Sequence, residues 1–252
     1  VRFVTQGILT NWPREIQILS PNFVVTRFPL QPLRRFARRS LENGQHVGRF
    51  FFDLYARANK RGGAWMDGAR DKRRDAQGQL IAPVANLVCN FTPPVGGKPA
   101  LLTHDEVTTL FHEFGHALHG MFSKVRYPSM AGTAVPRDFV EFPSQVNEMW
   151  LSWPEVMDNY AKHYETGEKL PQEWIENLKA ASTFNEGHAT TSYMEAAILD
   201  LAWHSLPADA EVSSVEEFEA KAIADYGLDY HAVPTRYRST YFSHIFAGGY
   251  SA

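Results

Sequence analysis

Residues 101–122 read LLTHDEVTTLFHEFGHALHGMF. Thr103 followed by Glu106 is a capping-box pattern, in which the threonine caps the first helical turn and the glutamate reaches back to it. Behind this cap, apolar side chains recur at helical spacing. They are Val107, Leu110, Phe111, Phe114, Leu118 and Met121. The stretch therefore predicts an amphipathic helix that begins directly after Thr103.

Inside this helix, residues 112–116 form the motif His-Glu-x-x-His. Residues four apart project from the same face of a helix, so His112 and His116 can offer two imidazole ligands to one metal ion. Glu113 points beside the ion, where it can take a proton from a metal-activated water. The motif also arises by chance, but its place on a capped helix favours a zinc site, because the chemistry requires a helix.

Catalytic zinc needs a third ligand from the protein, and a carboxylate on a following helix is the usual solution. Glu141, which comes 25 positions after His116, is the candidate. Glu148 would share the face of Glu141 on a continuous helix, either as a support for the site or as a surface carboxylate. His119 is expected to serve in packing or polar support, and Asp138 is expected to cap a helix.

The rest of the chain predicts a mainly α-helical fold with a small antiparallel β-sheet near its start. Two strands are predicted over residues 47–55 and 80–91, with a turn at 60–63 between them. Residues 1–41 are cut by prolines and stay unassigned. Further helices are predicted over residues 143–150, 154–165, 171–183, 188–204, 214–226 and 236–246. No repeat or flexible linker interrupts this sequence, which predicts one unit.

Composition is that of an ordinary soluble globular protein, with 44% apolar and 21% charged residues. A net charge of −3 gives no indication of nucleic acid or an anionic membrane as a partner. The basic clusters at 34–39 and 70–74 are interpreted as solvated faces. The single cysteine, Cys89, fits a reducing, cytoplasmic compartment and is expected to be buried rather than nucleophilic. The sequon at Asn90 is interpreted as accidental.

The residues around the motif resemble the signature of the thimet oligopeptidase family of zinc metallopeptidases. Further segments that are similar to this family lie at residues 52–65, 87–91, 139–145 and 237–250. The resemblance runs from about Glu42 to the end of the chain. Residues 137–143 are most similar to the dipeptidyl carboxypeptidases, with the oligopeptidase A branch as the rival.

This resemblance implies a zincin-like catalytic region with one zinc ion held by His112, His116 and Glu141. It implies that Glu113 is the general base. The implied reaction is the hydrolysis of short peptides, with release of C-terminal dipeptides, by a monomer that binds neither nucleic acid nor membranes.

The resemblance also implies that His244 and Tyr250 steady the tetrahedral intermediate, since fixed donors at the developing oxyanion lower the barrier. A guanidinium group would suit the free carboxylate of a peptide substrate. Arg236 and Arg238 are the candidates, with structural ion pairing as the alternative for each.

Members of the family are usually more than twice as long and continue beyond Tyr250. We therefore expect residues 42–252 to form a catalytic region that is incomplete at both ends, preceded by residues 1–41, which are not family-like. Three alternatives stay open. The chain could be an inactive zinc-binding fragment, an endopeptidase similar to oligopeptidase A, or a helical domain in which the motif is a coincidence.

Overall fold

The computed structural model describes residues 2–4, 23–27, 35–41, 46–95, 100–163 and 166–247, with backbone alone before residue 47. Within it the chain divides into two compact units, residues 1–170 and 171–252, which are described separately below. No linker-like composition marks this division in the sequence. The prediction that family-like sequence begins at residue 42 stays a prediction.

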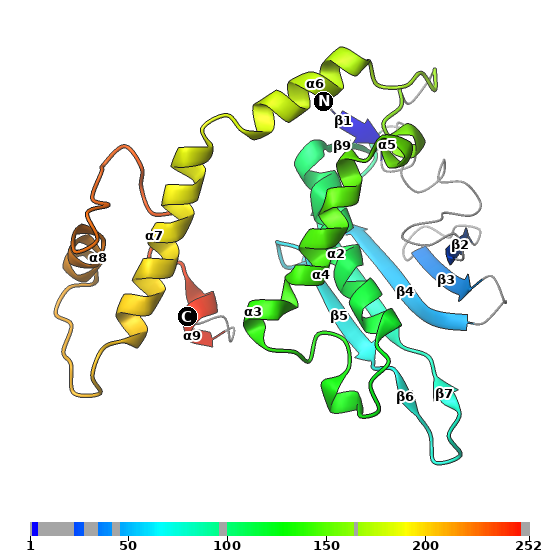
Figure 1. Ribbon diagram of the computed structural model, residues 1–252, viewed down its shortest axis with the longest axis horizontal. Helices are drawn as coiled ribbons and strands as arrows, with labels where there is room; N and C mark the ends of the chain where they lie inside the picture. Colours follow the sequence, from blue (N-terminus) through cyan, green and yellow to red (C-terminus); the bar gives the residue numbers. More distant parts are fainter. Residues whose placement is uncertain are drawn as a thin grey trace. The chain divides into compact units, whose positions relative to one another are not determined.

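A five-stranded sheet forms the framework of the first unit (Figure 1). Its strands lie in the order β2, β3, β4, β8, β5. They span Phe23–Arg27, Arg35–Leu41, His46–Tyr55, Val84–Phe91 and Trp65–Arg70 in that order. Two small two-stranded sheets accompany it: β1 (Arg2–Val4) pairs with β9 (Leu101–Thr103), and β6 (Arg73–Arg74) pairs with β7 (Leu80–Ile81).

The five-stranded sheet is mixed, so the predicted antiparallel sheet is wrong in one pairing. Strands β4 and β8 are parallel neighbours, with Arg49 opposite Val84 and Phe52 opposite Leu87. The chain leaves β4, passes along the outer edge as β5 and returns to fill the place between them. The returning strand β8 is thus parallel to β4 on one side and antiparallel to β5 on the other. The two strands themselves lie close to their predicted bounds.

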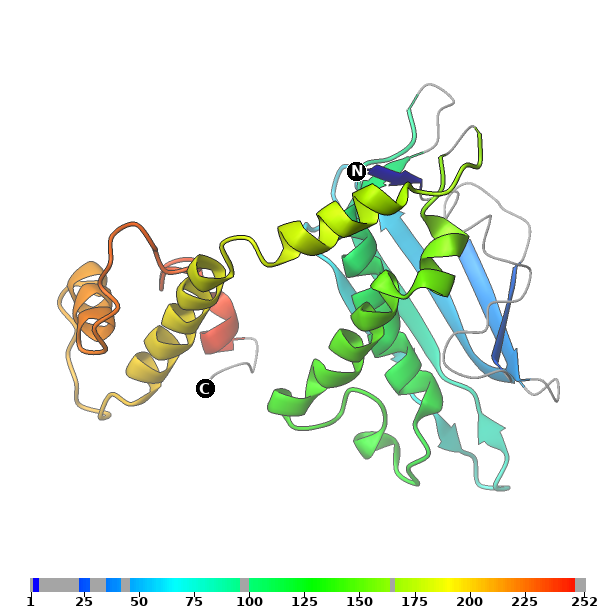
Figure 2. The ribbon, with the colours of Figure 1, turned by 45° about the horizontal axis from the view of Figure 1, so that its top comes forward.

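The core lies between this sheet and the helix α2 (His104–Phe122), which crosses one face of the sheet (Figure 2). Alternate residues of β8 are buried beneath the helix, as a sheet with one covered face requires. On β4 the ring of Phe50 meets the ring of Phe114 from α2 edge-on, with centroids 5.3 Å apart. The buried aromatic and aliphatic side chains of β4 and β8 therefore fix the position of α2, the helix that carries the motif.

The predicted start of α2 is confirmed. The Thr103 hydroxyl accepts a hydrogen bond from the backbone N–H of Glu106 at 3.2 Å. In return, the Glu106 carboxylate accepts from the backbone N–H of Thr103 at 2.8 Å. The residues predicted from their spacing to face the core, from Val107 to Met121, are buried.

After α2 the chain forms short helices: α3 (Arg137–Val140), α4 (Phe142–Glu148), a 3₁₀ turn (Met149–Ser152) and α5 (Pro154–Tyr160). Helix α5 ends earlier than predicted, because the chain turns back and the N–H of Leu170 bonds to the Ala161 carbonyl at 2.8 Å. Asp138 is not a cap, since α3 begins one residue before it with Pro136 at the cap position.

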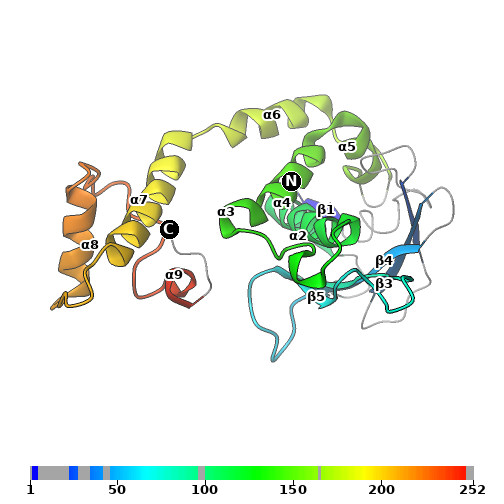
Figure 3. The same cartoon turned by 60° about the horizontal axis from the view of Figure 1, so that its bottom comes forward.

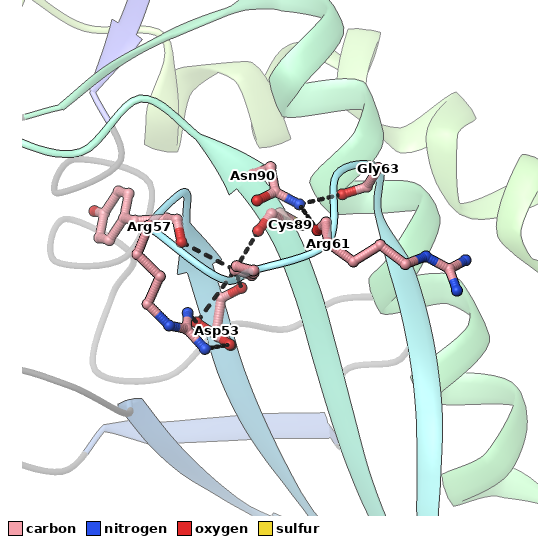
Figure 4. Close-up of polar contacts among 8 residues, drawn as sticks. Asp53, Arg57, Arg61, Gly63, Cys89 and Asn90 are labelled. Atoms are coloured by element: carbon pink, nitrogen blue, oxygen red, sulfur yellow. Dashed lines mark hydrogen bonds and ion pairs between the residues drawn. The ribbon is translucent and has the colours of Figure 1, made fainter.

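A polar cluster holds the turn at residues 56–63 to the ends of β4 and β8. The ammonium group of Lys60 donates to the carbonyls of Asp53 and Tyr55 at 2.8 and 3.0 Å, and also to that of Cys89. Figure 4 shows the Arg57–Asp53 ion pair and the Asn90 amide, whose nitrogen donates to the carbonyls of Arg61 and Gly63, each at 2.8 Å.

This cluster settles two predictions made from the sequence. The Cys89 side chain is fully buried, and burial raises the pKa of its thiol to about 12, which removes the thiolate that a nucleophile would need. The Asn90 amide is committed to the turn, which gives the asparagine of the sequon a structural role.

The predicted basic face at residues 70–74 lies on and beside the β6–β7 hairpin, where Arg70, Arg73 and Arg74 are exposed. Arg34 and the side chains of the other predicted basic cluster lie outside the described residues.

The second unit is helical, with α6 (Gln172–Ser182), α7 (Glu186–His204), α8 (Val215–Ala224) and α9 (Ser243–Ala247). Helices α7 and α8 pack against each other (Figure 3), with the rings of Trp203 and Phe218 4.1 Å apart. The first three helices match their predicted ranges within two residues. Among the described helices, none combines the length and the hydropathy needed to cross a bilayer.

The predicted helix over residues 236–246 is mostly wrong, since only its end, from Ser243, is helical. Two backbone N–H groups in the first part of this segment bond to other elements instead of to the preceding turn. The N–H of Arg236 donates to the Ser192 carbonyl at 3.0 Å, and that of Ser239 donates to the Glu219 carboxylate. These tertiary partners replace the helical bonds, which local periodicity alone could not reveal.

Candidate metal centre

Three side chains of the first unit converge as a metal-binding set. His112 and His116 extend from one face of α2, and Glu141 lies at the junction of α3 and α4. One oxygen of Glu141, Oε2, lies 3.0 Å from Nε2 of His112 and 3.1 Å from Nε2 of His116. Among the described residues, this is the one group of three or more such side chains close enough to share an ion. The structure thus brings the three predicted ligands together.

The spacing of these atoms fits a tetrahedral ion. Bonds of about 2.0–2.1 Å to nitrogen and oxygen place neighbouring ligand atoms of a tetrahedron about 3.3 Å apart. The distances from Oε2 of Glu141 to the two Nε2 atoms, 3.0 and 3.1 Å, fall slightly below that value. Two imidazoles and one carboxylate are also the donor set of a catalytic zinc site with an open position.

The close approach of α4 to α2 places Glu141 at the centre, and Gly115 makes this approach possible. A Cβ atom at Gly115 would lie 2.6 Å from the Cα of Ser144 and 3.0 Å from the Cβ of Asn147. Where the two helices meet, the amide of Asn147 donates to the Phe111 carbonyl at 2.6 Å. Gly115 therefore has a structural reason to stand between the two histidines of the motif.

Two further side chains orient the ligands. The Glu148 carboxylate lies 2.6 Å from Nδ1 of His112, so a proton on Nδ1 leaves the Nε2 lone pair facing Glu141. The Ser144 hydroxyl bonds to Oε2 of Glu141 at 2.9 Å and to its carbonyl at 2.8 Å. Of the two interpretations of Glu148, the geometry supports the one that gives it a role at the site. Ser144 was not expected from the sequence, although its place three residues after Glu141 was a usable signal.

Glu113 is buried beside the ligands, with only 5% of its surface exposed. Its Oε2 atom has no hydrogen-bond partner among the residues that the structure describes. Burial raises the pKa of this carboxyl to about 7; the nearby His112 opposes the shift and Glu141 adds to it. A carboxyl with this pKa can both accept and release a proton near neutral pH, as a general base must.

A further histidine of the helix, His119, packs as predicted. Its ring meets Phe139 edge-on, with centroids 6.3 Å apart, and burial lowers the pKa of the imidazole. Burial also lowers the pKa of His116, which keeps that imidazole in the neutral form that binds metal.

The other predicted site residues belong to the end of the chain. His244 lies on α9 in the second unit, and Tyr250 lies outside the described residues. The grouping of these two residues with the metal centre stays a prediction. The Arg238 guanidinium pairs with the Glu219 carboxylate, and Arg236 lies over the rings of Tyr193 and Tyr237. Both arginines therefore make structural contacts within their own unit.

Comparison with known proteins gives a consistent result. The sequence pattern of peptidase family M3 matches residues 36–252. The dipeptidyl carboxypeptidase of Salmonella typhimurium is 49% identical over 210 residues, which make up 83% of this chain and 30% of that protein. Oligopeptidase A of Escherichia coli is 43% identical over 227 residues, which make up 86% of this chain and 32% of that protein. The chain spans about a third of the length of these curated relatives.

Proposed function

This chain belongs to peptidase family M3, as its resemblance to the thimet oligopeptidases predicts, and we propose that it carries the zinc centre of an enzyme that hydrolyses short peptides. The observation that supports the proposal most strongly is the set formed by His112, His116 and Glu141, with the buried Glu113 beside it. Neither a structural nor a purely regulatory role explains why a carboxyl next to the ligands should be buried without a partner for its Oε2 atom.

In the proposed hydrolysis, the side chains around the metal centre have different roles. A zinc ion held by the three ligands would supply a Lewis acid that polarises the scissile carbonyl and acidifies water. Glu113 accepts a proton from the attacking water and returns it to the leaving amine. Glu148 and Ser144 hold the ligands in orientation through the hydrogen bonds described above.

His244 and Tyr250 are proposed to donate hydrogen bonds to the oxygen that gains negative charge during the attack. Support for this role comes from the match of the family pattern, which extends through both residues. No contact in the described part of the chain bears on it.

Release of C-terminal dipeptides is the specific reaction that we propose. It rests on the higher identity to the dipeptidyl carboxypeptidases of Salmonella typhimurium and Escherichia coli, 49% and 45%, than to the bacterial and plant oligopeptidase A proteins, at 40–44%. The substrates would then be short peptides with a free carboxyl terminus. A monomeric state and a cytoplasmic location complete the proposal; one matched relative from Arabidopsis thaliana is named a probable cytosolic oligopeptidase A.

Mass spectrometry of peptide products tests this proposal. Short peptides with free or amidated C-termini are incubated with the zinc-loaded chain, and with a Glu113→Gln variant as the control. Release of dipeptides from free C-termini alone, lost in the variant, would support the carboxypeptidase. Internal cleavage of both series would support an endopeptidase similar to oligopeptidase A.

Two other results would count against the proposal. Zinc bound without any cleavage would favour the second candidate, an inactive zinc-binding fragment, which is consistent with a chain that spans a third of its relatives. Failure to bind zinc at all would overturn both.

A further inference from the structure

A second buried carboxylate without a bond to one of its oxygens lies in the other unit, far along the chain from the motif. Glu195, on α7, keeps 1% of its surface exposed. Its Oε1 atom has no hydrogen-bond partner among the residues that the structure describes. A buried ionised carboxyl costs several kcal/mol unless a cation or several donors compensate its charge, so this side chain requires an explanation.

Glu195 lines an open hollow of about 660 Å³ between α7, α8 and residues 228–238, which we name the α7–α8 hollow. That volume lies within the range of pockets that hold small molecules. The walls combine aliphatic side chains, Ile223 and Leu228 among them, with charged ones, and the lining includes Tyr230, which has 67% of its surface exposed. All of these residues belong to the second unit.

Of the three basic side chains that line the hollow, Arg238 and Lys221 form ion pairs with carboxylates other than Glu195, and His231 is exposed. The Arg238 guanidinium pairs with Glu219, whose other oxygen accepts the backbone N–H of Ser239. The ammonium group of Lys221 pairs with Asp225. Each cation is thus committed to a carboxylate other than Glu195, and the charge of Glu195 remains available to a ligand.

A divalent metal ion is a poor fit for this charge. Calcium takes six to eight oxygen ligands, and magnesium needs near-octahedral geometry. Both oxygens of Glu219, the other buried carboxylate of the lining, are already engaged. An ammonium group needs one carboxylate and gains from an aromatic ring near it, and an aliphatic stem would suit the aliphatic side chains of the walls.

We propose that the α7–α8 hollow binds a small organic cation, a primary ammonium group on an aliphatic stem, with Glu195 as its counter-ion. Such a group occurs on a free alkylamine and on the lysine side chain of a polypeptide. Its residues belong to the second unit, whereas those of the proposed metal centre belong to the first, and the proposal does not depend on peptidase activity.

Methyl NMR of the full chain, with the isoleucine methyl groups labelled, tests the proposal through the resonance of Ile223. Three probes are titrated: pentylammonium, its uncharged analogue pentanol, and Nα-acetyl-lysinamide, which carries the ammonium on a peptide-like backbone. We expect the Ile223 resonance to shift and saturate with at least one of the two ammonium probes and to respond little to pentanol. A preference between the two ammonium probes identifies the source of the natural ligand.

Two matched variants test whether Glu195 is the counter-ion of the bound ammonium group. Glu195→Gln should weaken binding of the ammonium probe by about tenfold, the cost of losing a hydrogen bond to a charged partner. Glu217→Gln makes the same change at an exposed position on α8 and should leave binding unchanged.

Equal affinity of the two variants would overturn the proposal, and so would a response to pentanol as strong as that to pentylammonium. The pentanol comparison uses the wild-type chain, so it decides the matter even if Glu195→Gln does not fold. The absence of any shift at Ile223 with either ammonium probe would also overturn it.

Discussion

At Glu113, the burial that costs stability is also what makes the side chain reactive. Water would hold this carboxyl ionised and weakly basic, whereas its burial on α2 raises the pKa of the group to about 7. The neighbouring ligands have the opposite requirement, because His116 must stay neutral, and burial lowers its pKa. Burial therefore favours the protonation behaviour that each proposed role requires, for Glu113 as the base and for His116 as a ligand.

Replacing Glu113 by Gln should reduce peptide hydrolysis by about 10²–10⁴-fold, because the proton acceptor is removed while the shape is kept. Zinc content should not change, since Glu113 is not a ligand in the proposed centre. Metal analysis and cleavage rates of the same preparation check both statements. Glu155→Gln, at an exposed position on α5, is the control. Unchanged hydrolysis in the Glu113 variant would exclude its role as the base.

The raised pKa of Glu113 also predicts a pH dependence for the metal-free protein. Between the ordinary pKa of 4.5 and about 7, the folded state keeps a proton that the unfolded chain has released. The contribution of this group to the free energy of unfolding is therefore complete at low pH and lost as the pH rises through this window, by up to about 3 kcal/mol.

Urea unfolding of the metal-free protein at pH values across this window measures the effect. His116 titrates with the opposite slope, so the difference between the wild type and Glu113→Gln isolates the glutamate. A difference that does not vary with pH would show that Glu113 ionises normally.

Glu148 acts on the centre through another residue. Removing its charge with Glu148→Gln should weaken zinc binding by about 10–100-fold, because the Nδ1 atom of His112 loses the carboxylate that sets its tautomer. Competition with a chromophoric chelator measures the affinity. An unchanged affinity would return Glu148 to the alternative interpretation, a surface carboxylate.

At the scale of elements, the centre depends on how closely two helices approach. Helix α2 carries two of the proposed ligands on adjacent turns, and the third, at the start of α4, comes near them only because Gly115 lets the backbones touch. The cap at Thr103 fixes where α2 begins, and the rings of Phe50 and Phe114 fix how it lies on the sheet. Each of these contacts depends on a different residue or pair of residues: Gly115, the cap at Thr103, and the rings of Phe50 and Phe114.

Gly115→Ala should destabilise the fold by about 1–3 kcal/mol, because the new Cβ meets the backbone of Ser144, which cannot rotate away. It should also weaken zinc binding, since it pushes Glu141 away from the imidazoles. Gly120→Ala is the matched control on the same helix, where a Cβ has nothing within 4 Å. That control should be neutral or stabilising, by up to about 1 kcal/mol. Chemical unfolding compares the two, and equal effects would refute the argument from close approach.

At the scale of the whole molecule, the proposed ion ties together segments that the sheet alone does not join. It would connect α2 to the junction of α3 and α4, which carries Glu141. A ligand that binds the folded state and not the unfolded state stabilises the fold by mass action.

Removing zinc with a chelator should therefore lower the free energy of unfolding by about 4 kcal/mol if free zinc was present at about 1,000 times its dissociation constant. Thermal unfolding with and without the chelator measures this difference. His112→Gln provides the control, because it removes a ligand and should abolish the response to zinc. A wild-type protein insensitive to the chelator would contradict the proposed site.

The sequence by itself determined the features that depend on residues close together in the chain. The helix from His104 with its cap, the two histidines on one face, the burial of Cys89 and the bounds of β4 and β8 all followed from spacing within a few residues. Helical and strand periods are local properties, so a single sequence displays them.

Only the tertiary structure decided the features that depend on partners far apart in the chain. The parallel pairing of β4 with β8, the contact of Glu148 with His112 and the hollow around Glu195 are of this kind. So is the non-helical course before Ser243, where backbone N–H groups bond to Ser192 and Glu219. Which donor finds which acceptor across tens of residues depends on how whole elements pack, and no local pattern in the sequence records that choice.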